Sequence, residues 1–115
     1  MPLTQGPQFV VAEITECTDI AGTHLHQCAV NVGTKILQIV CGAENARVGL
    51  KTVCAVEGAF LPNGMLITAG KLKGIDSFGM LCSGRELNLT QFGAKGIIEL
   101  DAHYPIGANF FEVLK

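Results

Sequence analysis

The stretch LHQCAVNVGTKILQIVC, residues 25–41, carries the pattern that decides the fold class. Polar and apolar side chains alternate over residues 25–32, as in a β-strand with one buried face. The Gly-Thr pair at 33–34 then predicts a turn, and the β-branched segment 35–41 predicts a returning strand. This stretch is therefore predicted to form a β-hairpin.

Glycine spacing extends the same pattern over the rest of the chain. The 14 glycines fall at fairly even intervals, which is typical of short strands joined by tight turns. Further strands are predicted at residues 9–14, 50–56, 65–69, 78–82 and 97–100. Single helical turns are predicted at 43–48, after the S-x-x-E pattern at 83–86 and after the N-x-x-E pattern at 109–112. Such a set predicts an all-β domain, either a small closed barrel (OB or SH3-like) or a sandwich.

Composition limits the class of partner. The 115 residues suffice for one domain, and their net charge of −2 excludes a strongly basic, self-sufficient nucleic-acid binder. Only 16% of the residues are charged and the mean hydropathy is +0.40, so some apolar surface is expected to meet a partner. No apolar run approaches the roughly 18 residues of a membrane span, and no secretion signal precedes the first strand. An odd number of cysteines without C-x-x-C spacing favours buried free thiols in a cytoplasmic protein.

No catalytic or cofactor motif is present in the sequence. The glycines around Ser77 do not have the G-x-S-x-G spacing of a nucleophile elbow, and no phosphate-binding loop occurs. His24 and His26 would share a strand face with Cys28 and could begin a metal site, but a structural zinc site needs four ligands. A polar strand face is the favoured interpretation, so we expect no catalytic residue, no cofactor and no metal.

Two lysines form the best candidate for contact with a polyanion. Lys71 and Lys73 would lie on one face of a strand, and they precede Gly74, where a ligand can approach the backbone closely. Binding through two to four phosphate contacts would be weak and sensitive to salt. The same pattern is typical of a solvated barrel rim, and composition alone favours a structural or interaction module over an RNA binder.

Several segments resemble one family in order and spacing. The segments are IVCGAEN (39–45), GAFLPNG (58–64), KLKGIDSFGMLCS (71–83), ELNL (86–89), GIIEL (96–100) and PIG (105–107). They resemble the tRNA-binding domain of the bacterial phenylalanyl-tRNA synthetase β subunit, and the resemblance covers about residues 9–115. The loop at residues 18–25 departs from the family, because it lacks the HPNAD pattern.

This resemblance implies a small closed OB-fold barrel with about five main strands and short helical turns. It implies an N-terminal extension at 1–8 and a tRNA-binding domain at 9–115, in a cytoplasmic bacterial protein. The chain would be a non-catalytic module that contacts the tRNA backbone weakly, because the ATP-dependent ligase of which such a domain is part carries its catalytic site elsewhere. The residues expected to contact RNA are Lys71, Lys73 and Ser77, with Arg47 and Lys51 as helpers.

The resemblance leaves the context of the domain open. It is either an excised part of the ligase β subunit or a free-standing relative. The alternative to RNA binding is a structural OB domain that packs against other synthetase domains, the α subunit or a second copy of itself.

Overall fold

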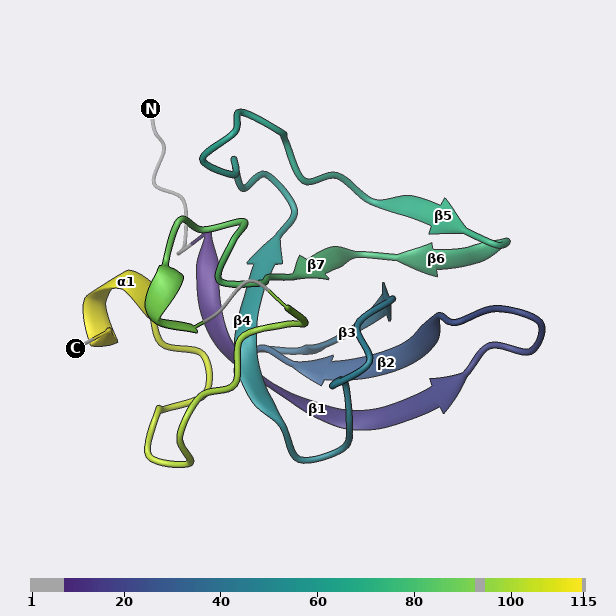
Figure 1. Ribbon diagram of the computed structural model, residues 1–115, viewed down its shortest axis with the longest axis horizontal. Helices are drawn as coiled ribbons and strands as arrows, with labels where there is room; N and C mark the ends of the chain where they lie inside the picture. Colours follow the sequence, from purple (N-terminus) through teal and green to yellow (C-terminus); the bar gives the residue numbers. More distant parts are fainter. Residues whose placement is uncertain (1–7, 93–94, 115) are drawn as a thin grey trace.

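The computed structural model describes residues 8–92 and 95–114 (Figure 1). Its elements in chain order are β1 (Phe9–Asp19), β2 (His26–Asn31), β3 (Ile36–Cys41), β4 (Lys51–Val56), β5 (Gly70–Leu72), β6 (Ile75–Ser77), β7 (Gly79–Leu81), a 3₁₀ turn η1 (Thr90–Phe92) and a short helix α1 (Phe110–Val113). Five strands form an antiparallel sheet in the order β3-β2-β1-β4-β7, and β5 pairs with β6 in a separate hairpin. Residues 1–7 of the expected N-terminal extension lie outside the described residues.

A short seam brings the two edges of the five-stranded sheet together. The backbone N–H of Phe78 donates to the carbonyl of Gln38 at 2.9 Å, and the Nε2 of Gln38 donates to the carbonyl of Asp76 at 2.8 Å. The sheet thereby curves into a nearly closed barrel that resembles an OB fold. This confirms the all-β barrel predicted from the sequence.

Strand β1 belongs to both halves of the barrel. Its first part pairs with β4, from Phe9 to Glu13, and its second part pairs with β2, from Glu13 to Asp19. The register shifts between Ile14 and Glu16, which is the signature of a bulge that bends a strand. The strand predicted at 9–14 is therefore longer than expected, because the polar residues that follow the bulge continue the pairing.

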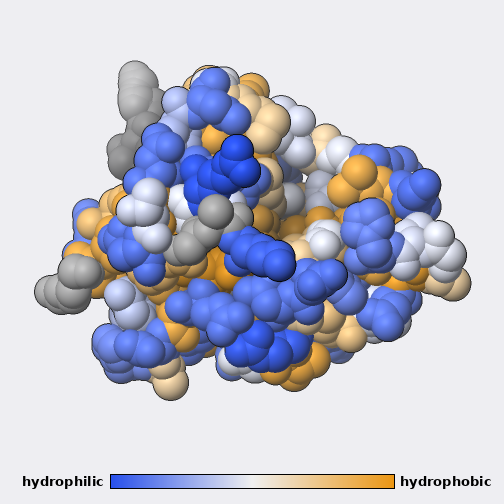
Figure 2. All heavy atoms as spheres, viewed as in Figure 1, coloured by the Kyte–Doolittle hydropathy of each residue, from blue (hydrophilic) through white to orange (hydrophobic). Residues whose placement is uncertain are grey.

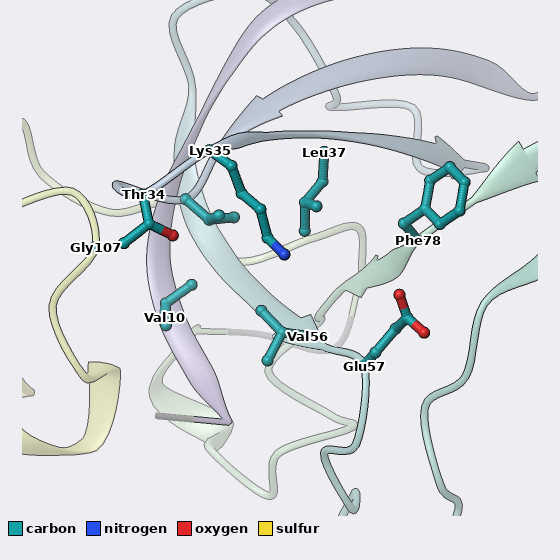
Figure 3. Close-up of a pocket in the computed structure, with 9 residues that line it drawn as sticks. Val10, Thr34, Lys35, Leu37, Val56, Glu57, Phe78 and Gly107 are labelled. Atoms are coloured by element: carbon teal, nitrogen blue, oxygen red, sulfur yellow. The ribbon is translucent and has the colours of Figure 1, made fainter. Parts of the chain in front are cut away.

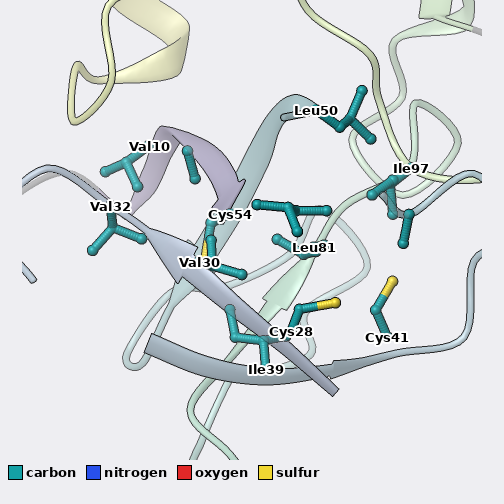
Figure 4. Packing of buried hydrophobic residues seen from close by; sticks show 13 residues of the cluster. Val10, Cys28, Val30, Val32, Ile39, Cys41, Leu50, Cys54, Leu81 and Ile97 are labelled. Carbon is teal, nitrogen blue, oxygen red and sulfur yellow. The ribbon is translucent and has the colours of Figure 1, made fainter. Parts of the chain in front are cut away.

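Two hydrophobic clusters lie on opposite sides of the sheet. The inner cluster fills the barrel and includes Ile14, Cys28, Val30, Ile39 and Cys54 (Figure 4). The outer cluster packs the C-terminal segment, residues 82–92 and 95–114, onto β1 and β4. Its fully buried members include Val11, Val53, Ile98 and Phe110.

Two glycines let the C-terminal segment approach the barrel closely. Gly107 has a φ of +89° and its N–H donates to the carbonyl of Val11 at 2.8 Å. A Cβ atom on Gly33, at the β2–β3 turn, would lie 2.7 Å from the Cα of Gly107. No side chain fits between these two backbones, so glycine is required at the contact.

The predicted helical turns have different outcomes. Asn109 caps α1 as predicted, and its side-chain Oδ1 accepts from the N–H of Phe111 at 3.2 Å. The expected capping box also forms, since the N–H of Ser83 donates to Glu86 at 2.8 Å and the N–H of Glu86 donates to the Ser83 hydroxyl at 3.2 Å. It stabilises a turn and not a helix, however, and residues 43–48 likewise form turns.

Two of the predicted strands are absent from the described residues. In the segment 65–69 only Leu66 pairs, through an isolated bridge to Phe60, and in 97–100 only Leu100 pairs, with Lys51. Ile67, Ile98 and Leu100 are buried in the outer cluster and Ile97 in the inner cluster, which accounts for part of the strand-like composition of these segments. Among the described residues, no helix is long and apolar enough to cross a membrane.

Candidate nucleic-acid interface

The β5–β6 hairpin projects away from the barrel and carries both candidate lysines (Figure 1). Its turn consists of Lys73 and Gly74, whose φ angles are +54° and +80°. Positive φ at both central residues is typical of a type I′ hairpin turn. The two lysines therefore do not share a strand face as predicted: Lys71 lies in β5 and Lys73 lies at the tip.

Lys73 occupies a backbone conformation that asparagine or glycine adopts more easily. A left-handed conformation costs a residue with a Cβ about 1–2 kcal/mol. The turn thus holds a long cation at its tip at some conformational cost, an arrangement often associated with functional positions.

Both hairpin lysines are exposed. The ammonium of Lys71 lies 3.4 Å from a carboxylate oxygen of Asp76, and both side chains are at least half exposed. Such a surface pair contributes little free energy, so Lys71 can exchange this partner for a phosphate. Hydrophilic and hydrophobic residues are mixed over the hairpin at the right of the space-filling view (Figure 2).

A sheet surface beside the hairpin is left free of both hydrophobic clusters. We call this surface the open face; it is the outward side of β2 and β3. Its six residues are paired across the strands, as Gln27 with Val40, Ala29 with Gln38 and Asn31 with Ile36. The hairpin and the β1–β2 loop project from the same side of the barrel (Figure 1). In OB folds this strand surface and its flanking loops bind oligonucleotides.

Ser77 lies at the base of the hairpin and not on its surface. Its side chain is 7% exposed, and its hydroxyl oxygen accepts from the N–H of Val40 at 3.0 Å. The hydroxyl thus belongs to the seam that closes the barrel. Contact between Ser77 and RNA stays a prediction, and the structure gives this hydroxyl a structural partner.

Arg47 is engaged with a carboxylate at some distance along the sequence. Its guanidinium donates to both carboxylate oxygens of Glu99, at 3.2 and 3.3 Å, and to the carbonyl of Asn45 at 3.0 Å. Hydrogen bonds from Arg47 and from the Asn45 amide lower the pKa of Glu99, and Glu99 in turn raises the pKa of Arg47. The pair is exposed on both sides, so Arg47 is accessible but already neutralised.

Lys51 is also engaged within the chain. Its ammonium donates to the carbonyl of Tyr104 at 2.6 Å and to that of Ala102 at 2.5 Å. These bonds tie the loop after Leu100 to β4. The role of Lys51 as a helper in RNA contact stays a prediction; the observed contacts are those of a structural cation.

The thiols and imidazoles do not form a chemical centre in the described part of the chain. The structure brings together no group of three metal-ligating residues within 8–92 and 95–114. His26 instead lies 2.8 Å from a carboxylate oxygen of Asp19. Burial raises the pKa of Cys28 and of Cys54 to about 12, so these thiols stay protonated at neutral pH.

Comparison with known proteins shows the family to which this chain belongs. Residues 9–109 match the model of the family described as "Putative tRNA binding domain". The chain belongs to this tRNA-binding-domain family. The resemblance noted in the sequence is thereby confirmed.

Individual relatives fall into two groups. The chain is 49% identical to an uncharacterised protein of Mycoplasma pneumoniae over 113 residues, which is 97% of this chain and 48% of that protein. It is 50% identical over 107 residues to the phenylalanine–tRNA ligase β subunit of Haemophilus ducreyi, covering 91% of this chain and 14% of the subunit. The corresponding subunit of Rhodospirillum rubrum is 48% identical over 112 residues, covering 92% of this chain and 13% of the subunit. The chain thus spans about half of the mycoplasma relative and a small part of each ligase subunit.

Proposed function

We propose that this chain is a non-catalytic tRNA-binding module, which contacts the RNA backbone through the β5–β6 hairpin. The observation that supports this most directly is the pair of exposed cations Lys71 and Lys73 on a projecting hairpin, in a chain of the tRNA-binding-domain family. The adjoining open face carries the amides of Gln27, Gln38 and Asn31, which already form hydrogen bonds within the chain and would have to exchange some of them for sugars and bases.

The charge balance limits the strength of this contact. The chain has a net charge of −2, and Arg47, Lys51 and Lys71 already have partners within the chain, that of Lys71 being an exposed carboxylate. Two phosphate contacts give a slope of roughly −1.5 in log K against log salt concentration. Such a module raises the local concentration of tRNA without selecting its sequence strongly.

A salt-dependent titration tests this function. The chain is titrated with mixed tRNA at about 50 mM and about 200 mM salt, a range over which phosphate contacts weaken strongly. We expect the Lys71→Glu/Lys73→Glu variant to bind more weakly at low salt and to have a flatter salt dependence. The matched control is Arg85→Glu/Lys95→Glu, which changes the net charge equally on exposed residues outside the hairpin.

The control separates local contact from overall charge. If both double variants lose affinity equally, tRNA responds to net charge and the hairpin is not the site. If the chain binds no tRNA at either salt concentration, the proposed function is wrong.

A second candidate function is packing against a protein. The loop between β4 and β5 exposes Phe60, Met65 and Leu66, which are 57%, 47% and 45% exposed. In a larger protein such a surface would meet neighbouring domains, and in isolation it would favour self-association. Sedimentation of the chain with and without Phe60→Ser distinguishes the cases, since a monomer that binds tRNA leaves this candidate without support.

A further inference from the structure

A pocket of about 300 Å³ opens where the barrel wall is incomplete. It lies between the start of β3 and the end of β4, and its apolar wall consists of Val10, Val32, Leu37, Val56 and Phe78 (Figure 3). Strand β7, which joins β4 to the seam, has only three residues and pairs no farther than Val56. The wall therefore stays open beyond that point.

Two charged side chains of opposite sign stand at this pocket. Lys35 directly precedes β3 and Glu57 directly follows β4, and both point toward the same space (Figure 3). In the part of the chain that the structure describes, neither side chain has an ion-pair partner, and each is exposed. The apolar pocket thus has one cation and one anion available for a ligand.

We propose that this pocket receives one unpaired nucleotide whose base carries an exocyclic amino group. This proposal rests on the proposed function for its choice of nucleotides. The ring of Phe78 offers a stacking surface, the ammonium of Lys35 offers a partner for phosphate, and the carboxylate of Glu57 accepts hydrogen bonds from the amino group.

The chemistry of Glu57 also sets the specificity. Cytosine and adenine each present an amino group, and guanine presents an amino group beside a ring N–H, all of which donate to a carboxylate. Uracil presents a carbonyl oxygen where cytosine presents its amino group, which a carboxylate repels, and only its single ring N–H can donate. The pocket is therefore expected to discriminate against uridine nucleotides.

Size and position fit this ligand. The volume is at the lower end of the roughly 300–1,000 Å³ found for ligand pockets, which suits one base and excludes a base pair. Phe78 directly follows β6, so the pocket lies at the base of the hairpin that carries Lys71 and Lys73. An RNA strand held by the hairpin lysines can place a single-stranded nucleotide there, and unpaired nucleotides are the usual targets of base recognition in RNA.

The binding test uses four nucleoside monophosphates as probes. The chain is titrated separately with CMP, AMP, GMP and UMP, and the binding is followed by NMR shifts of backbone amides. We expect the largest shifts at residues 35–37, 56–57 and 78, with UMP binding about tenfold more weakly than CMP because its carbonyl faces an unpaired carboxylate.

Variants of the lining residues assign the roles. Glu57→Gln should remove the discrimination against UMP, because an amide can donate to the uracil carbonyl. Lys35→Gln should lower the affinity for all four nucleotides by about fivefold. Phe78→Leu should lower it by at least as much, because stacking is lost. The control Arg85→Gln, outside this pocket, should change neither affinity nor discrimination.

Several results would overturn the proposal. Equal binding of UMP and CMP would exclude the role of Glu57, and shifts confined to other residues would exclude the pocket. Binding of a free amino acid such as leucine, in the absence of nucleotide binding, would assign the pocket to small zwitterions. The tRNA titration is independent of these results: Lys71→Glu/Lys73→Glu should leave CMP binding intact. Failure of tRNA binding alone therefore contradicts the proposed function, and failure of nucleotide binding alone contradicts the pocket.

Discussion

The C-terminal segment has little regular structure and the β5–β6 hairpin is a pair of strands, and the two regions are held to the barrel in very different ways. The C-terminal segment places Ile98 and Phe110 in the outer cluster and bonds its backbone to β1 and β4. The hairpin exposes all three residues of β5 and reaches the barrel chiefly at its base, through Ser77 and Phe78. Burial, and not helix or strand content, fixes the first region and leaves the second free to meet a partner.

Single cations also differ in whether they are held by contacts within the chain or left exposed. Lys51 and Lys71 are the same residue type, but Lys51 donates to two carbonyls of the C-terminal segment, whereas Lys71 has only an exposed carboxylate nearby. A lysine that completes a fold is a poor candidate for an RNA contact, because the ligand must replace its internal bonds. The comparison therefore favours the two hairpin lysines among the five candidate RNA contacts, all of which stay predictions.

Removing the anchor of the C-terminal segment is expected to have the largest effect. Phe110 is fully buried, so Phe110→Ala should lower the free energy of unfolding by about 3–5 kcal/mol, through lost burial and a residual cavity. Denaturant unfolding followed by circular dichroism measures this. Tm should fall as well.

The neighbouring phenylalanine gives a matched control. Phe111 is 48% exposed and contacts Phe9 edge-on with ring centroids 5.5 Å apart, so Phe111→Ala should cost only about 1 kcal/mol. Equal losses for the two variants would mean that the outer cluster does not hold the segment as the structure indicates.

The next largest effect is expected from loosening the attachment of the hairpin to the barrel. Ser77→Ala removes the hydroxyl that accepts from the Val40 N–H, and a buried donor left unpaired costs about 1–3 kcal/mol. The free energy of unfolding should fall by this amount, while tRNA affinity should stay unchanged. The exposed hydroxyl of Thr68 provides the control variant Thr68→Ala. If Ser77→Ala instead lowers tRNA affinity at unchanged stability, its hydroxyl contacts RNA as the family resemblance implied.

The sequence predicts those elements of the fold that depend on residues close together along the chain. The hairpin of residues 25–41 and the N-cap at Asn109 follow from alternation and from local side-chain chemistry, and both are present. The strand expected at 65–69 is wrong: Ile67 is buried in the outer cluster, Met65 and Leu66 are exposed, and one isolated bridge joins the segment to Phe60. The apolar composition of the segment alone cannot distinguish this arrangement from a strand.

The candidate site is predicted less completely, because its cations are assigned by distant partners. Glu99 lies 52 residues after Arg47, and Tyr104 lies 53 residues after Lys51, so no local pattern reveals either contact. Lys73 is placed at the tip by the two-residue turn, which a reading of 71–73 as continuous strand misses. The pocket between Lys35 and Glu57 likewise depends on where β7 ends, which only the fold shows.

Lys51 and Lys71 can be compared directly. Lys51→Ala should lower the free energy of unfolding by about 1 kcal/mol, a value reduced from that of buried charged hydrogen bonds because the side chain is only half-buried. Lys71→Ala should leave stability unchanged and weaken tRNA binding. The reverse pattern, with stability lost at Lys71 and RNA affinity lost at Lys51, would exchange the roles of the two regions.

The smallest expected effect concerns the pH dependence of the C-terminal segment. Hydrogen bonds from Arg47 and then from Asn45 hold the pKa of Glu99 below its ordinary value of 4.5. A carboxyl group with a lowered pKa in the folded state stabilises the protein above its unfolded pKa, and this contribution is lost as the pH falls through the lower, folded value. Thermal unfolding below pH 4.5 should therefore show a shallower decline of Tm for Glu99→Gln than for the unchanged chain. Identical declines for the unchanged chain and Glu99→Gln would mean that the Arg47–Glu99 pair does not persist in solution, and Arg47 would then be as available to RNA as the hairpin lysines.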